Sequence, residues 1–435
     1  MSFLSLKFKR QQLTPAVHRD GPMDWPRMVL PLSNSQNVRA SCDVVSAISR
    51  HPTPETEAFR LLDTWFCPAT EDAKFWWHMI GRPLALLLHE AGYDIHNQYG
   101  SLLFFRHCIA GRLGARPTST GSPQVWRSFM TDDFSPVEYS WCWDTPKGPP
   151  RIRFSVDAIG PDAGTQSDPF NQEMTTDLVR HVESVASNVD WKLFNHFRNA
   201  FCEQGLEKRV SEGCDDLEKS HTSSIFMAFE LHKSEVAVKA YFVPVKAEQT
   251  GRSRLSVLSD SIVSLEKSDL RVGAYDQMLA FMTSDAEGSH LEIVGIAVDC
   301  VLPKDSRLKL YVRSPSTSFD SVCAIMTLGG KLNTFPQATW KDFRKLWQLT
   351  LGLGEDFAPG ANLQAKSHET AGVLYNFDIK AGNLLPEPKV YIPVKHYARN
   401  DLAAAKGLAS YLKSKGQDRF VESYMRALEE GKRRI

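Results

Sequence analysis

One seven-residue segment, RLKLYVR at 307–313, constrains the fold of this chain more than any other. Its residues alternate, so that Leu308, Leu310 and Val312 share one face of an extended strand while the cations and a tyrosine share the other. The apolar face can pack against helices, but the charged face has to line a space that accepts it. The segment therefore predicts a strand whose polar side faces inward.

The same alternation recurs in three other segments. Lys239 and Tyr241 share a face in VKAYFVPV. Lys389 and Tyr391 share one in PKVYIPV, and Arg153 occupies the equivalent face of RIRFSV. A single strand of this kind is usually a solvated sheet face, but chance does not explain the pattern on several strands. Four strands that each turn a cation to one side predict a closed sheet with a basic, aromatic interior.

The composition is that of a soluble globular protein with no preference for polyanions or membranes. Of 435 residues, 42% are hydrophobic and 23% are charged, and 51 Lys and Arg balance 51 Asp and Glu. A chain without net charge has no global field to attract nucleic acid or a membrane surface, so any basic site has to be local. The apolar runs are too short to span a membrane, and MSFLSLKFKRQQ at the start lacks the features of a secretory signal. Scattered cysteines without a CxxC pair are typical of reduced thiols in a cytoplasmic protein.

Helices and hairpins alternate along the chain. After residue 54 the order helix, strand, strand, helix repeats at intervals of about seventy to ninety residues. The expected strand pairs are 136–144 with 151–160, 224–233 with 235–246, 290–301 with 306–314, and 368–380 with 388–398. Consecutive hairpins whose apolar faces meet helices can curl into a barrel with a polar interior. We interpret 54–435 as one domain and 1–53, which holds several prolines and a polar SNSQN run, as an irregular or partly disordered extension.

These segments resemble the fungal aromatic prenyltransferases of the dimethylallyltryptophan synthase type. The similarity covers about residues 60 to 431, and its motifs are KFWW, QYGSLLFFRHCIAGRLGARP, SPVEYSW, RIRFSVDAIGPDAGTQSDPFN, VKAYFVPVK, RLKLYVR and PKVYIPVKHYARND. The resemblance implies an α+β fold, in which αββα (ABBA) repeats form an antiparallel β-barrel with a polar lumen surrounded by helices. Relatives carry a fifth strand pair after the last helix, which the C-terminal residues here do not match. We therefore expect an incomplete fifth repeat, a gap in the barrel and reduced or absent turnover.

The resemblance also implies roles for particular residues. Glu138 in SPVEYS corresponds to the glutamate beside the aromatic acceptor. The residues that correspond to the diphosphate ligands are Arg153, Lys239, Arg307, Lys309 and Lys389. The residues that correspond to the tyrosines shielding the allylic cation are Tyr241, Tyr311 and Tyr391. The implied reaction is metal-independent transfer of a dimethylallyl group from its diphosphate to an indole or phenolic natural product in secondary metabolism.

The residue types suit this chemistry. A diphosphate carries about three negative charges, and fixed cations in a site that excludes water stabilise the further charge that forms when the prenyl C–O bond breaks. Tyrosine rings stabilise a nearby cation by roughly 0.5–2 kcal/mol each and also exclude water. A glutamate that accepts the N–H of an indole or the O–H of a phenol raises the electron density of the ring for attack.

The sequence lacks the aspartate motif that binds magnesium diphosphate in other prenyl-transferring folds. Asp132-Asp133 is followed by Phe-Ser-Pro and Asp215-Asp216 by Leu-Glu-Lys, so neither pair forms DDxxD. We therefore expect no metal and no other cofactor, with dimethylallyl diphosphate as the co-substrate.

Two other functions are compatible with a barrel. One is a non-catalytic or low-activity barrel that binds a prenyl diphosphate or an aromatic metabolite. The other, a lipocalin-like carrier, is disfavoured because a carrier needs an apolar lumen. The sequence leaves open an indole or a phenolic acceptor, and a monomer or a homodimer. No nucleic acid or membrane partner is expected.

Overall fold

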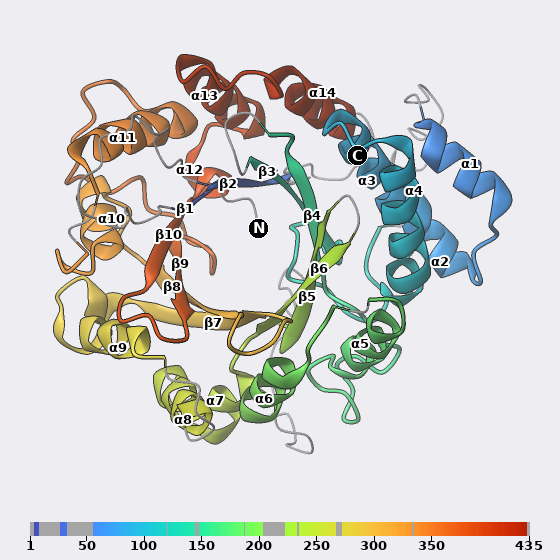
Figure 1. Ribbon diagram of the computed structural model, residues 1–435, viewed down its shortest axis with the longest axis horizontal. Coiled ribbons are helices and arrows are strands. Elements are labelled where there is room, and N and C mark those ends of the chain that lie inside the picture. Colours follow the sequence, from blue (N-terminus) through green and yellow to red (C-terminus); the bar gives the residue numbers. More distant parts are fainter. Residues whose placement is uncertain are drawn as a thin grey trace, which may run out of the picture.

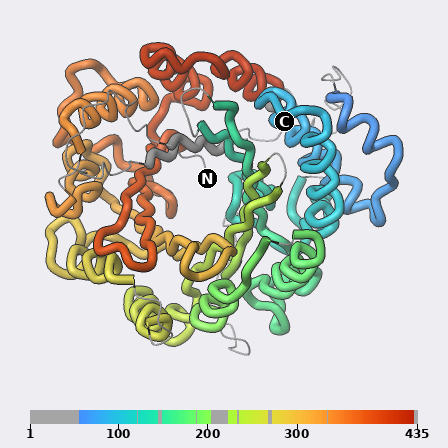
Figure 2. Tube along the Cα trace, in the orientation of Figure 1, coloured from blue at the N-terminus to red at the C-terminus, as the bar shows by residue number. Residues whose placement is uncertain are grey.

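The chain forms a β-barrel inside a ring of helices. The computed structural model describes residues 4–7, 27–32, 55–119, 121–143, 148–186, 188–202, 222–232, 235–266, 272–332 and 335–432. Figure 1 looks into the barrel, with helices on its outside around the whole circumference. The trace in Figure 2 follows the chain once around this ring, from α1 back to α14.

Ten antiparallel strands close the barrel in the order β1-β10-β9-β8-β7-β6-β5-β4-β3-β2. Their bounds are β1 Leu4–Lys7, β2 Arg27–Leu32, β3 Val137–Trp143, β4 Arg151–Val156, β5 Ile225–Leu231, β6 Val236–Phe242, β7 Glu292–Asp299, β8 Arg307–Ser314, β9 Val373–Lys380 and β10 Glu387–Ile392. The four predicted strand pairs are confirmed as β3 with β4, β5 with β6, β7 with β8 and β9 with β10.

The fifth strand pair corrects the sequence prediction. β1 pairs with β10, β2 pairs with β3, and β1 and β2 pair with each other. The expected gap in the barrel is therefore wrong. Within the expected irregular or partly disordered extension 1–53, residues 4–7 and 27–32 form strands, and the other residues lie outside the described part of the chain. Eight strands alone would leave backbone N–H and C=O groups unpaired on the outer edges of β3 and β10. The short strands β1 and β2 provide hydrogen-bond partners for these edges. The strand pair was missed because it precedes the first repeat instead of following the last.

The helices form the outer layer. Their bounds are α1 Glu57–Trp65, α2 Glu71–Trp76, α3 Arg82–Glu90, α4 Ile95–Phe104, α5 Glu173–Val185, α6 Lys192–Phe201, α7 Val245–Thr250, α8 Arg254–Glu266, α9 Ala274–Ser284, α10 Phe319–Met326, α11 Gln337–Leu351, α12 Val394–Tyr397, α13 Asp401–Ser414 and α14 Val421–Lys432. Side-chain hydrogen bonds cap the N-termini of several helices. At α1 the Thr56 hydroxyl accepts a hydrogen bond from the backbone N–H of Phe59, and at α10 the Ser318 hydroxyl accepts one from that of Ser321. Within the described ranges, no helix is long and apolar enough to cross a membrane.

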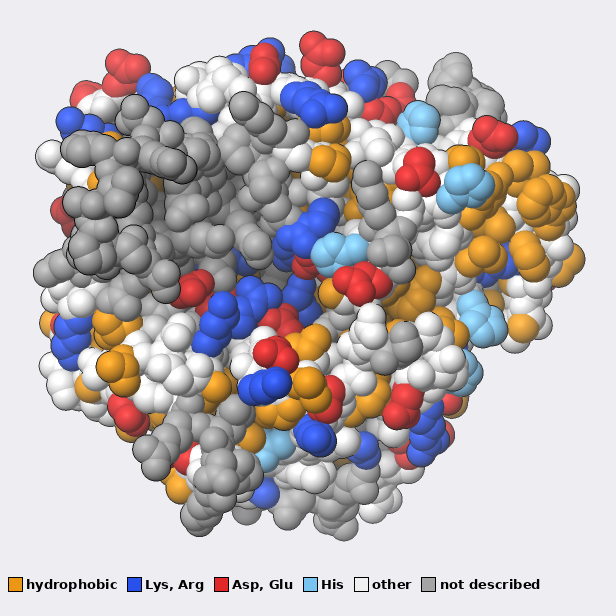
Figure 3. All heavy atoms as spheres, viewed as in Figure 1, with side chains coloured by type: hydrophobic (Ala, Val, Ile, Leu, Met, Phe, Trp, Pro, Cys, Tyr) orange, Lys and Arg blue, Asp and Glu red, His pale blue; other side chains and the backbone are white. Residues whose placement is uncertain are grey.

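The hydrophobic core lies between the barrel and the helices. In β4 the fully buried Ile152, Phe154 and Val156 alternate with half-buried polar residues. Phe154 packs edge to face against Phe105, which follows α4, with 5.7 Å between ring centroids. Because the strands bury their apolar face outward, their polar face lines the lumen. Lys and Arg side chains accordingly gather near the centre of the face in Figure 3.

Candidate active site

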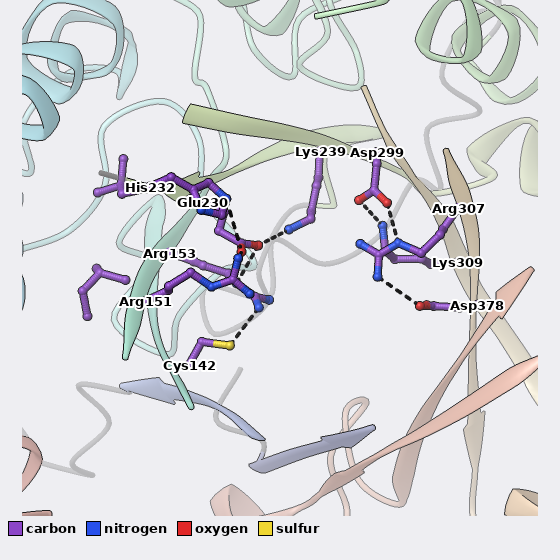
Figure 4. A network of polar contacts seen from close by, with 12 residues as sticks. Cys142, Arg151, Arg153, Glu230, His232, Lys239, Asp299, Arg307, Lys309 and Asp378 are labelled. Atoms are coloured by element: carbon purple, nitrogen blue, oxygen red, sulfur yellow. Dashed lines mark hydrogen bonds and ion pairs between the residues drawn. The ribbon is translucent and has the colours of Figure 1, made fainter. Parts of the chain in front are cut away.

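The first of two ion-pair clusters in the lumen centres on the Glu230 carboxylate of β5. Its Oε2 atom lies 2.5 Å from Lys239 Nζ on β6 and 3.0 Å from Arg153 Nε on β4. Its Oε1 atom contacts Arg151 and lies 3.5 Å from His232 Nε2. Figure 4 shows the side chains of Arg151, Arg153 and Lys239 converging on Glu230 from the neighbouring strands β4 and β6. Three cations here face one carboxylate.

The second cluster lies on the next three strands, β7, β8 and β9. Asp299 Oδ1 lies 2.5 Å from Lys309 Nζ, and Asp299 Oδ2 lies 2.6 Å from Arg307 Nε. Arg307 Nη1 also lies 3.2 Å from Asp378 Oδ2. The two clusters adjoin, because Lys239 and Asp299 are direct cross-strand partners. Two cations here contact two carboxylates.

Burial disfavours the charged form of several of these side chains. It lowers the pKa of the Lys309 ammonium to about 8, although Asp299 opposes the shift. Burial and the neighbouring Arg153 also lower the pKa of Lys239. Burial by itself would raise the pKa of the Glu230 carboxyl, but the cations around it hold that pKa well below its usual range. Cations held in this way gain more from an anionic ligand than exposed cations would.

Aromatic rings follow the cations along the same strands. The ring centroids of Tyr241 and Tyr311 lie 5.8 Å apart, and those of Tyr311 and Tyr391 lie 6.1 Å apart. The Tyr391 hydroxyl donates to the Tyr311 hydroxyl over 3.3 Å. Phe226 stacks on Tyr241 with 4.5 Å between centroids and 13° between planes. We call these four rings the aromatic wall. Lys389 lies at its end, with Nζ 4.8 Å from the centre of the Tyr391 ring.

Glu138 lies on β3, where its cross-strand neighbour is Ser155 of β4. Burial raises the pKa of the Glu138 carboxyl, and Lys395 of α12 opposes the shift. The charge of Glu138 in turn helps to raise the pKa of Tyr241, which burial brings to about 12. A raised pKa makes the Glu138 carboxylate a stronger proton acceptor once it is ionised.

Comparison with known proteins establishes the family. The model of the tryptophan dimethylallyltransferase family matches residues 72–427. The chain belongs to this family. A 4-O-dimethylallyl-L-tyrosine synthase of Claviceps purpurea (strain 20.1) is 36% identical over 349 residues, which cover 79% of this chain and 77% of that protein. A 7-dimethylallyltryptophan synthase of Aspergillus fumigatus is 35% identical over 377 residues, which cover 82% of this chain and 77% of that protein.

A solved structure shows the same fold. The crystal structure of AnaPT from Neosartorya fischeri matches with a TM-score of 0.70 at 23% identity, and the match covers 85% of this chain and 88% of that one. The α+β barrel of αββα repeats and the enzyme class, an aromatic prenyltransferase, were both predicted from the sequence and are confirmed.

The structure of this dimethylallyltransferase brings most of the predicted site residues together. Arg153, Lys239, Arg307 and Lys309 belong to the ion-pair network. The three predicted tyrosines belong to the aromatic wall, and Lys389 lies beside it. Their individual roles in catalysis stay predictions.

The sequence reasoning missed His232 and four charged members of the network. Arg151 lies two residues before Arg153, so the strand alternation could have identified it. The other three are the carboxylates Glu230, Asp299 and Asp378, which carried no such signal. In the part of the chain that the structure describes, no group of three or more His, Cys, Asp or Glu side chains is arranged to hold a metal ion.

Proposed function

We propose that the lumen transfers a dimethylallyl group from dimethylallyl diphosphate to the aromatic ring or phenolic oxygen of a small natural product. One observation carries the proposal: the ion-pair network and the aromatic wall occupy the same strands and face one space. Lys239 and Tyr241 are two residues apart on β6, as are Lys309 and Tyr311 on β8. An anion bound to the cations would therefore hold its organic group against the rings.

The network would bind the diphosphate and stabilise it as a leaving group. When the prenyl C–O bond breaks, both electrons stay on the bridging oxygen, so negative charge builds up on the diphosphate. Arg153 and Arg307 donate charge-assisted hydrogen bonds from planar guanidinium groups, and the lysines act as point charges. Because these side chains are already positioned by their carboxylate partners, little reorganisation is needed when the charge develops.

The aromatic wall would protect the allylic cation that the bond cleavage leaves behind. The faces of Tyr241, Tyr311 and Tyr391 offer negative π-density at successive positions around the barrel, each ring within about 6 Å of the next. The same rings exclude water, which would otherwise add to the cation and release dimethylallyl alcohol.

Glu138 would act on the acceptor. Its carboxylate accepts a hydrogen bond from the indole N–H or phenol O–H, which raises the electron density of the acceptor and holds it in register with the cation. A new bond forms between the acceptor and the allylic carbon, and the acceptor loses one proton. The two relatives named above are a tyrosine and a tryptophan dimethylallyl synthase, so we propose a phenol or an indole as the acceptor.

We also propose that the reaction needs no metal ion. In folds with aspartate-rich motifs, magnesium neutralises the diphosphate, whereas here the protein's own guanidinium and ammonium groups would do so. The small-molecule donor and acceptor are the partners that the site requires. The cytoplasmic location and the monomeric or homodimeric state stay predictions from the sequence.

The variant Glu138→Gln separates an enzyme from a barrel that only binds ligands. The expected result is a loss of turnover of about 10²- to 10⁴-fold, with the affinity for inorganic pyrophosphate unchanged in calorimetry. Glu355→Gln removes a carboxylate that is 88% exposed at the surface and serves as the matched control. Unchanged turnover in Glu138→Gln would contradict the role given to this residue.

A further inference from the structure

The hydroxyl of Tyr93 is inserted between two neighbouring strands of the barrel. It accepts a hydrogen bond from the backbone N–H of Ile152 on β4 over 3.1 Å and donates one to the backbone carbonyl of Leu231 on β5 over 2.6 Å. The ladder between β4 and β5 ends just before this point, at the pair Arg153 and Glu230. In the same register Ile152 would face Leu231 and bond to it directly at about 2.9 Å. The Tyr93 side chain therefore replaces a backbone hydrogen bond and keeps the two strand ends apart.

The local sequence fixes Tyr93 in this position. Gly92 has a positive φ of 75° and ends α3, with its N–H bonded to the carbonyl of His89 over 3.0 Å. The Tyr93 N–H bonds to the carbonyl of Leu88 over 3.0 Å, which completes a Schellman motif. Asp94 then caps the N-terminus of α4. Figure 1 shows α3 and α4 on the outer side of β4, so the turn between them directs Tyr93 toward the sheet.

The two bridged residues alternate with members of the first ion-pair cluster. On β4 the bridged residue lies between Arg151 and Arg153, and on β5 it follows Glu230. Successive side chains of a strand point to opposite faces, so the cluster lies on the lumen face while Tyr93 approaches from the helical layer. Figure 4 shows both arginine side chains meeting at Glu230. The separation of the two backbones at this point therefore sets how far apart the guanidinium groups and the carboxylate are anchored.

We propose that Tyr93 is a positioning residue for diphosphate binding, because its hydroxyl holds β4 and β5 at the separation in which Arg151, Arg153 and Glu230 form the first cluster. This inference rests on the proposed prenyl transfer, in which the ion-pair network binds the diphosphate. Tyr93 itself lies in the helical layer and acts only through the two strands. Its loss should therefore change the binding of the diphosphate and leave the binding of the acceptor unchanged.

Without the hydroxyl the two strand ends have two alternative arrangements. They can close until Ile152 and Leu231 bond directly, which moves the anchor points of the cluster together. Otherwise an N–H and a carbonyl stay unpaired at two fully buried residues, and the strand ends become less ordered. Both arrangements misalign the guanidinium groups with a bound diphosphate. The loss of one well-aligned charge-assisted hydrogen bond lowers affinity on the order of tenfold.

Calorimetric titration of the full chain with inorganic pyrophosphate tests the proposal. Tyr93→Phe should bind pyrophosphate about tenfold more weakly than wild type. The matched control is Tyr275→Phe, which removes a hydroxyl that bonds to Ser259 over 2.8 Å between α8 and α9. This control loses a comparable hydrogen bond in the helical layer and should keep the wild-type affinity. An affinity of Tyr93→Phe equal to that of the control would overturn the proposal.

Hydrogen exchange of the wild-type protein covers the case in which Tyr93→Phe does not fold. Coupling between two sites is reciprocal, so pyrophosphate that favours this strand arrangement should also stabilise the bridge. Amide exchange in the turn at 91–94 should slow when pyrophosphate binds, while exchange in α11 stays the same. Unchanged exchange in this turn would contradict the proposal.

Steady-state kinetics distinguish positioning from a merely structural role. In Tyr93→Phe the KM for dimethylallyl diphosphate should rise about tenfold, whereas the KM for the acceptor should keep its wild-type value. A variant that is only less stable would have a lower Tm and less active protein but an unchanged KM for both substrates. That result would refute the positioning role.

These measurements also separate the positioning role from the proposed function. If wild type prenylates no acceptor but Tyr93→Phe still weakens pyrophosphate binding, the proposed function fails and the positioning role stands. If prenylation is observed but neither the affinity for pyrophosphate nor the KM for dimethylallyl diphosphate changes in Tyr93→Phe, the positioning role fails and the proposed function stands.

Discussion

Raising the pH through 8 should remove a charge from the unliganded lumen at Lys309. Burial lowers the pKa of this ammonium to about 8, whereas an exposed lysine keeps its proton to about pH 10.4. Lys309 is 6% exposed and lies on the lumen face of β8 beside Arg307 and Asp299. A charge-assisted hydrogen bond contributes about 1.5–3 kcal/mol. Its loss should therefore lower kcat/KM for dimethylallyl diphosphate by roughly 10- to 150-fold above pH 8.

The lowered pKa of Lys309 has the opposite effect on stability: activity should fall as the pH rises, but stability should increase. Because the pKa of Lys309 is lower in the folded than in the unfolded protein, the unfolded state binds more protons between about pH 8 and pH 10. The contribution of Lys309 to the free energy of unfolding therefore increases as the pH rises through this window. Loss of activity above pH 8 without loss of stability would show that deprotonation in the lumen, and not unfolding, lowers the activity.

The assay compares wild type with Lys309→Arg. The two proteins are measured for kcat/KM from about pH 6.5 to about pH 9.5. A guanidinium stays charged over this range, so the decline above pH 8 should disappear in the variant. Lys304→Arg, in the exposed turn between β7 and β8, is the matched control and should keep the wild-type profile. An identical decline in Lys309→Arg would refute the assignment to Lys309.

Three further predictions concern the aromatic wall, the closure of the barrel and the metal. Tyr311→Leu removes one ring worth roughly 0.5–2 kcal/mol of cation stabilisation, so the ratio of dimethylallyl alcohol to prenylated product should rise in a product analysis; an unchanged ratio argues against shielding. Deletion of residues 1–32 removes β1 and β2 and exposes the edges of β3 and β10, so the Tm should fall and turnover should be lost; a wild-type melting curve would contradict their place in the barrel. Dialysis against EDTA should leave turnover intact, and a loss that magnesium alone restores would contradict the metal-independent mechanism.

Strand alternation made much of the site predictable. A period of two places every second side chain on one face, so Lys309 and Tyr311 identify the lumen face of β8, and Lys239 and Tyr241 that of β6. The apolar residues between them indicate that the other face packs against helices. These local regularities by themselves predict a polar barrel, and the family resemblance implies roles for the residues.

The carboxylates of the network were not predictable in the same way. Glu230, Asp299 and Asp378 lie on the strands adjacent to the basic ones, and their positions depend on the register between strands. Asp299 faces Lys239, and Asp378 faces Lys309, only in the register that the closed barrel adopts. The place of β1 and β2 is also a long-range property, because their partners β3 and β10 are distant along the chain.

The most direct test of the central claim is incubation of the full-length protein with dimethylallyl diphosphate and a mixed panel of indoles and phenols, with products read by mass spectrometry. The closed barrel, the ion-pair network and the aromatic wall predict at least one acceptor that gains a dimethylallyl group in place of a proton, with release of pyrophosphate. Binding of pyrophosphate without prenylation of any acceptor in the panel would contradict the claim and would identify the protein as a non-catalytic barrel.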